Sequence, residues 1–91
     1  MITYDETKRA INLKKHGLDL AIAGEVLAGF TISQEDTRAS YGEIRLKTLG
    51  LYRGVVVVVV IHTPRGSADH IISIRKADHH EKHTYWQNYP A

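Results

Sequence analysis

The sequence has no cysteine, which excludes disulfide bonds, thiolate metal ligands and cysteine nucleophiles. Its two prolines, Pro64 and Pro90, fall outside the interiors of the predicted helices and strands. The longest apolar run, residues 54–61, is far shorter than the ~20 residues that cross a bilayer. The first residues show no basic segment leading into an apolar one, as a secretory signal would. We therefore expect a cytoplasmic protein without a membrane partner.

A chain of 91 residues has room for one core, so we expect a single domain over residues 1–91. Hydrophobic residues make up 43% and charged residues 24%, which is typical of a folded protein. The formal net charge is +2, from twelve Lys and Arg against ten Asp and Glu. This balance is compatible with a polyanionic partner, but many domains with the same balance bind no nucleic acid.

The first third of the chain predicts two helices. Asp5 is a suitable N-cap for a helix running to about Lys15, and Gly17 can end it in the left-handed conformation. Few residues of this helix are apolar, so most of it should face solvent. A second helix with a broad apolar face should begin after Asp19 and end at Gly29.

The rest of the chain predicts strands and one more helix. Alternating or continuous apolar patterns predict strands at residues 30–36, 43–51, 55–61 and 70–76. Residues 63–66 have the sequence of a type I turn. In the last strand Ile72 and Ile74 should share one face, with Ile71 on the other. Asp78 and Glu81 have the spacing of a capping box, which predicts a C-terminal helix.

Helices followed by strands with short connections predict an α+β fold, with an antiparallel β-sheet, two N-terminal helices packed on one face and a C-terminal helix. The strand from Val55 to Ile61 is apolar on both faces, which indicates a central position. Either one set of its side chains stays partly open for a protein partner, or Tyr85, Trp86 and Tyr89 cover it.

Polar and basic side chains should lie on the sheet face away from the apolar side. These are Arg45 and Lys47 on one strand and Ser73 and Arg75 on another, with Arg65 at the connecting turn. Guanidinium groups pair with phosphate oxygens and stabilise charge that builds on phosphorus, so the arrangement suits a phosphodiester. The competing interpretation is that these residues serve solubility and protect sheet edges.

A second basic cluster, Lys14, Lys15 and His16, lies at the end of the first helix. Histidine transfers protons near neutral pH, and lysine does so when its pKa is lowered. Alternatively, the cluster only complements the helix dipole.

His79 and His83 have the spacing of a two-histidine metal site, but the helical H-E-x-x-H signature is one residue short. We therefore interpret them as exposed helical side chains and expect no metal and no cofactor. Glu81 is explained by the capping box, and Tyr85 with Tyr89 is most simply a packing stripe, although exposed aromatics also stack bases.

Four short motifs, in order along the chain, resemble those of the BrnT-like toxins. They are Tyr4-Asp5-Glu6-x-Lys8 with Asn12-x-x-Lys15-His16-Gly17, Asp36-x-Arg38-x-x-Tyr41-Gly42-Glu43-x-Arg45, Thr63-x-Arg65-Gly66, and Ile71-Ile72-Ser73-x-Arg75-x-Ala77-x-x-x-Glu81. Tyr85 follows at the expected distance. Two positions depart from the pattern, since His62 replaces a frequent tyrosine and His70 a frequent arginine.

The resemblance implies a RelE-like fold and a growth-inhibiting ribonuclease. It also implies a ribbon-helix-helix antitoxin that binds operator DNA and forms a hetero-oligomer with the toxin. Carried over by position, it implies that Lys15, His16, Arg65 and Arg75 are catalytic. It further implies that Arg45 and Glu43 contact RNA, to which the strand pattern adds Lys47 and Ser73.

The sequence thus leads to two hypotheses. In the first, a metal-independent endoribonuclease makes the RNA 2′-hydroxyl attack the adjacent phosphate, with Lys15 or His16 transferring protons. In the second, a non-catalytic module of the same fold only binds RNA or a protein partner.

Overall fold

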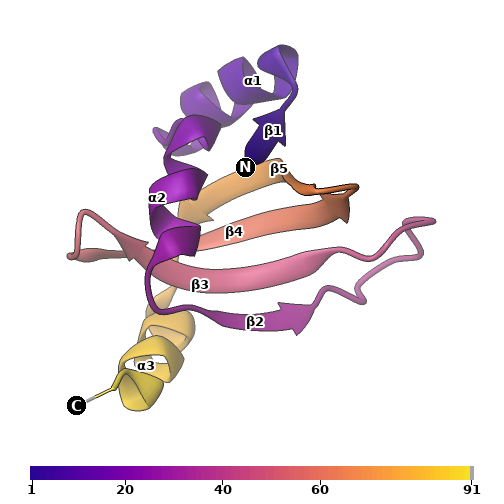
Figure 1. The fold of residues 1–91 in the computed structure, drawn as a ribbon. Helices are drawn as coiled ribbons and strands as arrows, with labels where there is room; N and C mark the ends of the chain where they lie inside the picture. Colours follow the sequence, from indigo (N-terminus) through magenta and orange to yellow (C-terminus); the bar gives the residue numbers. More distant parts are fainter. Residues whose placement is uncertain (91) are drawn as a thin grey trace.

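The computed structural model describes residues 1–90, which form an α+β fold built on one five-stranded sheet. Figure 1 shows its elements in chain order. They are β1 (Ile2–Tyr4), α1 (Glu6–His16), the 3₁₀ turn η1 (Leu20–Ile22), α2 (Ala23–Ala28), β2 (Ile32–Glu35), β3 (Leu46–Tyr52), β4 (Val56–Arg65), β5 (Ala68–Lys76) and α3 (His79–Asn88). None of the helices within residues 1–90 has the length and apolar character needed to cross a bilayer.

The sheet is mixed, so the prediction of a purely antiparallel sheet is wrong. Its strand order is β1-β5-β4-β3-β2, and β1 runs parallel to β5 whereas the other neighbours are antiparallel. The sequence pattern missed β1 because three residues are too few to show alternation.

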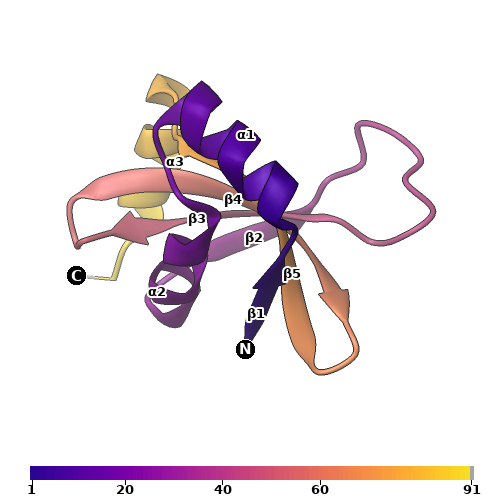
Figure 2. The same cartoon turned by 90° about the horizontal axis from the view of Figure 1, so that it is seen from above.

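Both faces of the central strand β4 are covered. Val58 and Val60 pack with Leu20 and Val26 in one core cluster. The alternate residues Val57, Val59 and Ile61 pack on the other face with Tyr85 of α3. Figure 2 shows α2 and α3 on opposite sides of the sheet. Of the two alternatives for the valine strand, the structure has the one in which it is covered, but only Tyr85 of the three aromatics belongs to the covering cluster. Val55, which precedes β4, is exposed.

Helix α1 lies at the sheet edge, and Asn12 is its only buried residue. The Asn12 amide donates to the backbone carbonyls of Leu18 and Ile74 and accepts from the Ile74 N–H. It takes the place of a strand partner where β5 extends past β1, because an unpaired backbone group is costly to bury. The prediction that both N-terminal helices pack on one face is thus wrong for α1, which is attached to an edge by hydrogen bonds.

A β-bulge changes the predicted faces of β5. Ile61 pairs with Ser73 but His62 pairs with Ile71, so Ile72 is an extra residue. Ile71 and Ile74 therefore share the first core cluster, while Ile72 packs against the second. The alternation predicted for this strand is wrong, because it assumed an uninterrupted period of two.

The local signals at helix ends are confirmed. The Asp5 side chain accepts from the Lys8 N–H, and Gly17 ends α1 at φ 71°. Asp78 and Glu81 form the predicted capping box at the start of α3. The turn after β4 is shifted: the strand continues to Arg65, and the chain reverses at residues 66 and 67, with Gly66 at φ 60°.

Candidate functional site: a basic cleft

A hollow of about 400 Å³, here called the basic cleft, opens where the end of α1 meets the sheet face that carries α3. Five of the residues predicted for RNA chemistry line it: Lys15, His16, Lys47, Ser73 and Arg75. Gln34 and Arg38 also line it, and sequence reasoning did not select them as site residues. The structure therefore brings together side chains from α1, β3 and β5 that are far apart in the sequence.

Two contacts position Lys15 and His16 at the cleft. Asn12, one turn earlier, attaches α1 to β5 as described above. Arg9 forms a bidentate pair with Asp19, with nitrogen–oxygen distances of 2.8 and 2.9 Å, which joins α1 to η1. Because these contacts join α1 to β5 and to the start of η1, they hold the C-terminal turn of α1 in a defined place beside β5.

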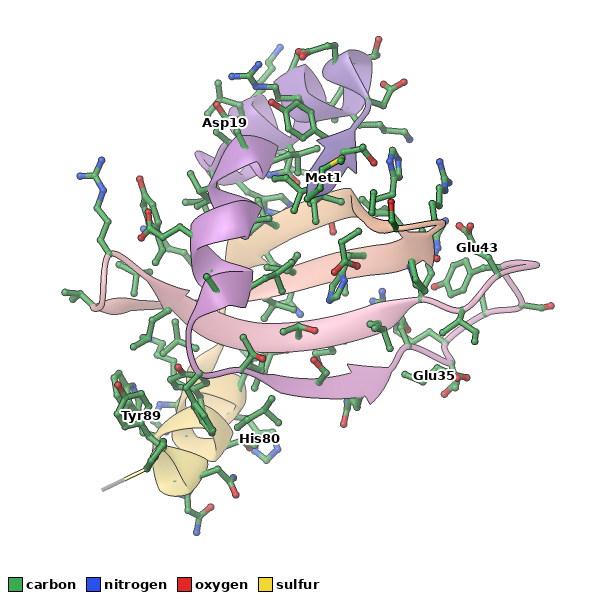
Figure 3. All side chains as sticks on the ribbon, viewed as in Figure 1. Met1, Asp19, Glu35, Glu43, His80 and Tyr89 are labelled. Atoms are coloured by element: carbon green, nitrogen blue, oxygen red, sulfur yellow. The ribbon has the colours of Figure 1, made fainter. Side chains whose placement is uncertain are left out.

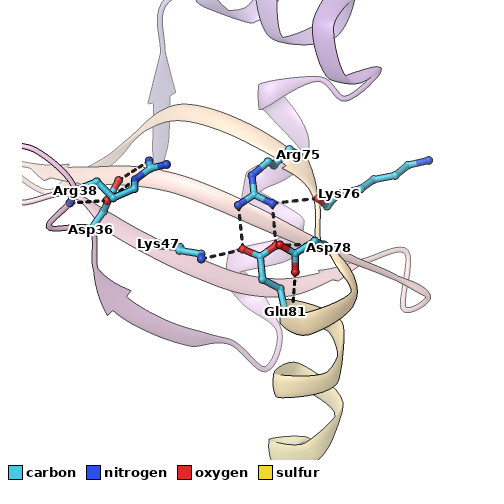
Figure 4. A network of polar contacts seen from close by, with 7 residues as sticks. All are labelled: Asp36, Arg38, Lys47, Arg75, Lys76, Asp78 and Glu81. Atoms are coloured by element: carbon cyan, nitrogen blue, oxygen red, sulfur yellow. Dashed lines mark hydrogen bonds and ion pairs between the residues drawn. The ribbon is translucent and has the colours of Figure 1, made fainter.

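Glu81 connects the two sheet cations of the cleft. Its carboxylate accepts from both terminal nitrogens of Arg75, at 2.8 and 2.9 Å, and lies 2.8 Å from the Lys47 ammonium (Figure 4). It also accepts from the Asp78 N–H. The Arg75 hydrogen bonds, with help from Lys47, hold the pKa of the buried Glu81 carboxyl far below its usual range. Glu81 thus orients both cations and leaves the trio with one net positive charge.

A second ion pair forms the opposite wall. The Asp36 carboxylate is buried and accepts two hydrogen bonds from the Arg38 guanidinium, each 2.8 Å long. These bonds lower the pKa of Asp36 to about 2. The Asp36 N–H also donates to the Arg45 carbonyl, which closes the loop between β2 and β3. Arg38 remains largely exposed at the cleft, and the Asp-x-Arg spacing was the only sequence signal for it.

The remaining predicted residues lie in a separate depression of about 300 Å³, here called the hairpin hollow. It contains Glu43, Arg45 and Arg65, with Lys8 of α1 and His70 of β5. Glu43 lies 3.7 Å from each arginine. The Arg45 guanidinium stacks over the Tyr41 ring at 3.9 Å. Arg45 lies directly before β3, which begins at Leu46, and it lines the hairpin hollow rather than the basic cleft that contains Lys47.

The structure thus divides the predicted site into two groups. Lys15, His16 and Arg75 share the basic cleft, whereas Arg65 does not line it. Both depressions border α1 and β5, the basic cleft at the end of α1 and the hairpin hollow at its first turns.

The histidines and aromatic residues outside the two depressions either pack in the protein interior or lie exposed on its surface. His62 is buried between Asp69 and Thr48, at 2.7 Å from each. His79 and His83 are exposed, and no three metal-ligating side chains gather within the described residues 1–90. Tyr85 is fully buried and donates to the Phe30 carbonyl, as expected of a packing residue. Trp86 is about half exposed.

Comparisons with known proteins agree with this architecture. Residues 4–81 match the family model described as ribonuclease toxin, BrnT, of type II toxin-antitoxin system. The fold is similar to that of the Brucella abortus ribonuclease toxin BrnT, solved by crystallography, with 34% sequence identity and a TM-score of 0.64. That match covers 85% of this chain and 95% of the Brucella chain. A search of curated proteins finds no significant match.

Proposed function

This chain belongs to the BrnT family of ribonuclease toxins of type II toxin–antitoxin systems, and we propose that it cleaves RNA in the basic cleft. The observation that carries the proposal is the placement of Lys15 and His16 beside Arg75 and Lys47 in one depression. Cations that bind a phosphodiester and groups that transfer protons are the two requirements of metal-independent RNA cleavage.

In the proposed reaction the RNA 2′-oxygen attacks the adjacent phosphorus and the bond to the 5′-oxygen breaks. The products are a 2′,3′-cyclic phosphate and a 5′-hydroxyl. Arg75 and Lys47 bind the phosphate and stabilise the charge that develops on it, because Glu81 holds both cations in place before substrate arrives. Lys15 and His16 take the proton from the 2′-hydroxyl and supply one to the leaving oxygen.

The hairpin hollow extends the proposed RNA surface. Arg65 and Arg45 share Glu43 as an acidic neighbour, which limits their mutual repulsion. We assign them to binding RNA on one side of the cleaved bond, with Ser73 contacting the strand in the cleft. The catalytic role expected for Arg65 from the resemblance then becomes one of substrate binding.

The proposal includes an antitoxin that neutralises the toxin. A ribbon-helix-helix protein that binds operator DNA would form a hetero-oligomer with this chain in the cytoplasm and prevent RNA from reaching the basic cleft. The family name supports the existence of an antitoxin, and its structural class is part of the proposal.

Purified protein should turn over RNA, which separates the enzyme from a module that only binds. We expect multiple turnovers in excess EDTA and products with 2′,3′-cyclic or 3′-phosphate ends. RNA binding without turnover would favour the binding module. Products with 5′-phosphates, or activity that EDTA abolishes and a divalent ion restores, would contradict metal-independent cleavage.

A further inference from the structure

A smaller cavity of about 140 Å³, here called the side pocket, adjoins the basic cleft between β2, β3 and α3. Gln34 and Lys47 line both the cleft and the side pocket, so the two are neighbours. Lys47 and Glu81 lie where the cavity meets the cleft, and the phosphate chemistry proposed above leaves the other lining residues of the cavity unused.

The side pocket has an apolar wall and a polar rim. Ile32 and Leu49 supply the wall, and Leu49 is itself part of the second core cluster. Gln34, Thr84 and His80 supply the polar groups, and Figure 3 shows His80 on α3 beside the sheet. Within residues 1–90 these three side chains form no hydrogen bond, since Asn88 contacts only the Thr84 carbonyl. They are therefore available to a ligand.

The size and composition fit one flat heterocycle. The cavity is smaller than the ~300–1,000 Å³ of pockets for drug-sized ligands, yet its volume of about 140 Å³ exceeds that of several waters at ~30 Å³ each. Proteins recognise unpaired RNA bases by apolar contact with the ring face and hydrogen bonds to the ring edge. A glutamine amide offers both a donor and an acceptor, and so matches an edge that carries one of each.

We propose that the side pocket binds one base of single-stranded RNA and gives the cleft a sequence preference. The inference rests on the proposed function, because Lys47 places the cavity directly beside the phosphate-binding cations. Gln34 and Thr84 hydrogen-bond the edge of the base, and Ile32 with Leu49 contacts its face. The base held there belongs to a nucleotide adjoining the cleaved phosphate.

Binding of small nucleotides tests the pocket without requiring cleavage. Dissociation constants of the four nucleoside 3′-monophosphates and of ribose 5-phosphate would be measured by NMR titration. We expect at least one nucleotide to bind tenfold or more tightly than ribose 5-phosphate. Thr84→Tyr fills the cavity and should remove that difference, whereas His83→Tyr places the same ring at an exposed position of α3 and should retain it.

Gln34→Ala is the second variant, because Gln34 is exposed on a strand and its loss should not disturb folding. It should lower the preference among bases at least fivefold and broaden the cleavage sites mapped on a long RNA. The pocket assignment is overturned if nucleotides bind no better than ribose 5-phosphate, or if both variants keep the wild-type preference. Failure of the proposed function would appear separately, as absence of RNA turnover by the wild-type protein.

Discussion

The carboxylate of Glu81 accepts hydrogen bonds from Arg75 and from the Asp78 backbone, and it contacts the Lys47 ammonium. It also belongs to the capping box that begins α3. One residue therefore connects the start of a helix to two cations of the cleft. A capping box alone would explain its type and spacing, and the sequence gives no sign that its oxygens also face β3 and β5.

Glu81→Gln should lower the free energy of unfolding at pH 7 by about 2 kcal/mol, because it weakens charge-assisted hydrogen bonds. The pKa of Glu81 is lower in the folded chain than the 4.5 of an ordinary glutamate, so its stabilisation is complete above that pH and is lost as pH falls. Urea denaturation between pH 2 and 7 should therefore show a flatter pH dependence for Glu81→Gln.

Glu6→Gln is the matched control, since the Glu6 side chain is 75% exposed in its pair with Arg9. Its free energy of unfolding should stay within ~0.5 kcal/mol of wild type. Equal acid sensitivity of Glu81→Gln and wild type would show that the buried pair does not govern stability at low pH.

Arg75→Ala and Lys15→Ala should each lower kcat about 30- to 1,000-fold, because they remove groups that act in the transition state, worth about 2–4 kcal/mol. Arg65→Ala should instead raise KM, because Arg65 lies in the hairpin hollow. Initial rates on a defined RNA measure both parameters. Lys15 is exposed, so its variant keeps the test valid if loss of Arg75 destabilises the fold.

The control for these variants is the double substitution His79→Ala and His83→Ala, which should leave both parameters unchanged. Full activity of Lys15→Ala and Arg75→Ala together with an inactive double variant would mean that the reaction occurs elsewhere on the protein.

Among the elements, those with strong local signals were predicted and those that depend on distant contacts were not. The caps of α1 and α3 follow from Asp5, Gly17 and Asp78, whose effects are confined to one helical turn. The bulge at Ile72 and the parallel pairing of β1 depend on which strand lies alongside, and a single sequence does not record that. The same bulge separates the β5 residues of the basic cleft, Ser73 and Arg75, from those of the hairpin hollow, which end at Ile72.

The position of helix α1 was predicted wrongly, yet two residues at its end, Lys15 and His16, line the cleft as part of the candidate site. The sequence identified Lys15 and His16 at its end, but assigned the helix to a sheet face. The buried amide of Asn12 places it at the β5 edge instead, so that its last turn reaches the face carrying Arg75. The sequence thus indicated which residues of α1 belong to the candidate site. Their position in the fold depends on the contact between Asn12 and Ile74, which the sequence does not predict.

At the scale of the whole molecule, the basic cleft lies on the sheet face that also carries α3. The end of α1, the start of the β2–β3 loop and strands β2 to β5 line the basic cleft, and α2 lies on the opposite side of the sheet from α3 (Figure 2). The net charge of +2 is small, so attraction for RNA depends on where cations gather rather than on their total. We therefore expect a neutralising partner to act at or near the cleft.

Co-expression with the antitoxin encoded by a neighbouring gene should restore growth and yield a complex on size exclusion. The valine strand is buried by α2 and α3, so the partner must use other surfaces, and we expect it to prevent RNA from binding in the cleft. At a free concentration 100 times its Kd, the antitoxin should stabilise the toxin by about 2.7 kcal/mol, measured as a higher Tm.

Arg75→Ala, expressed without growth arrest, should still form the complex, because assembly does not require RNA cleavage. Co-expression that neither restores growth nor produces a complex would contradict the proposed antitoxin, while the RNA-cleavage assays would be unaffected.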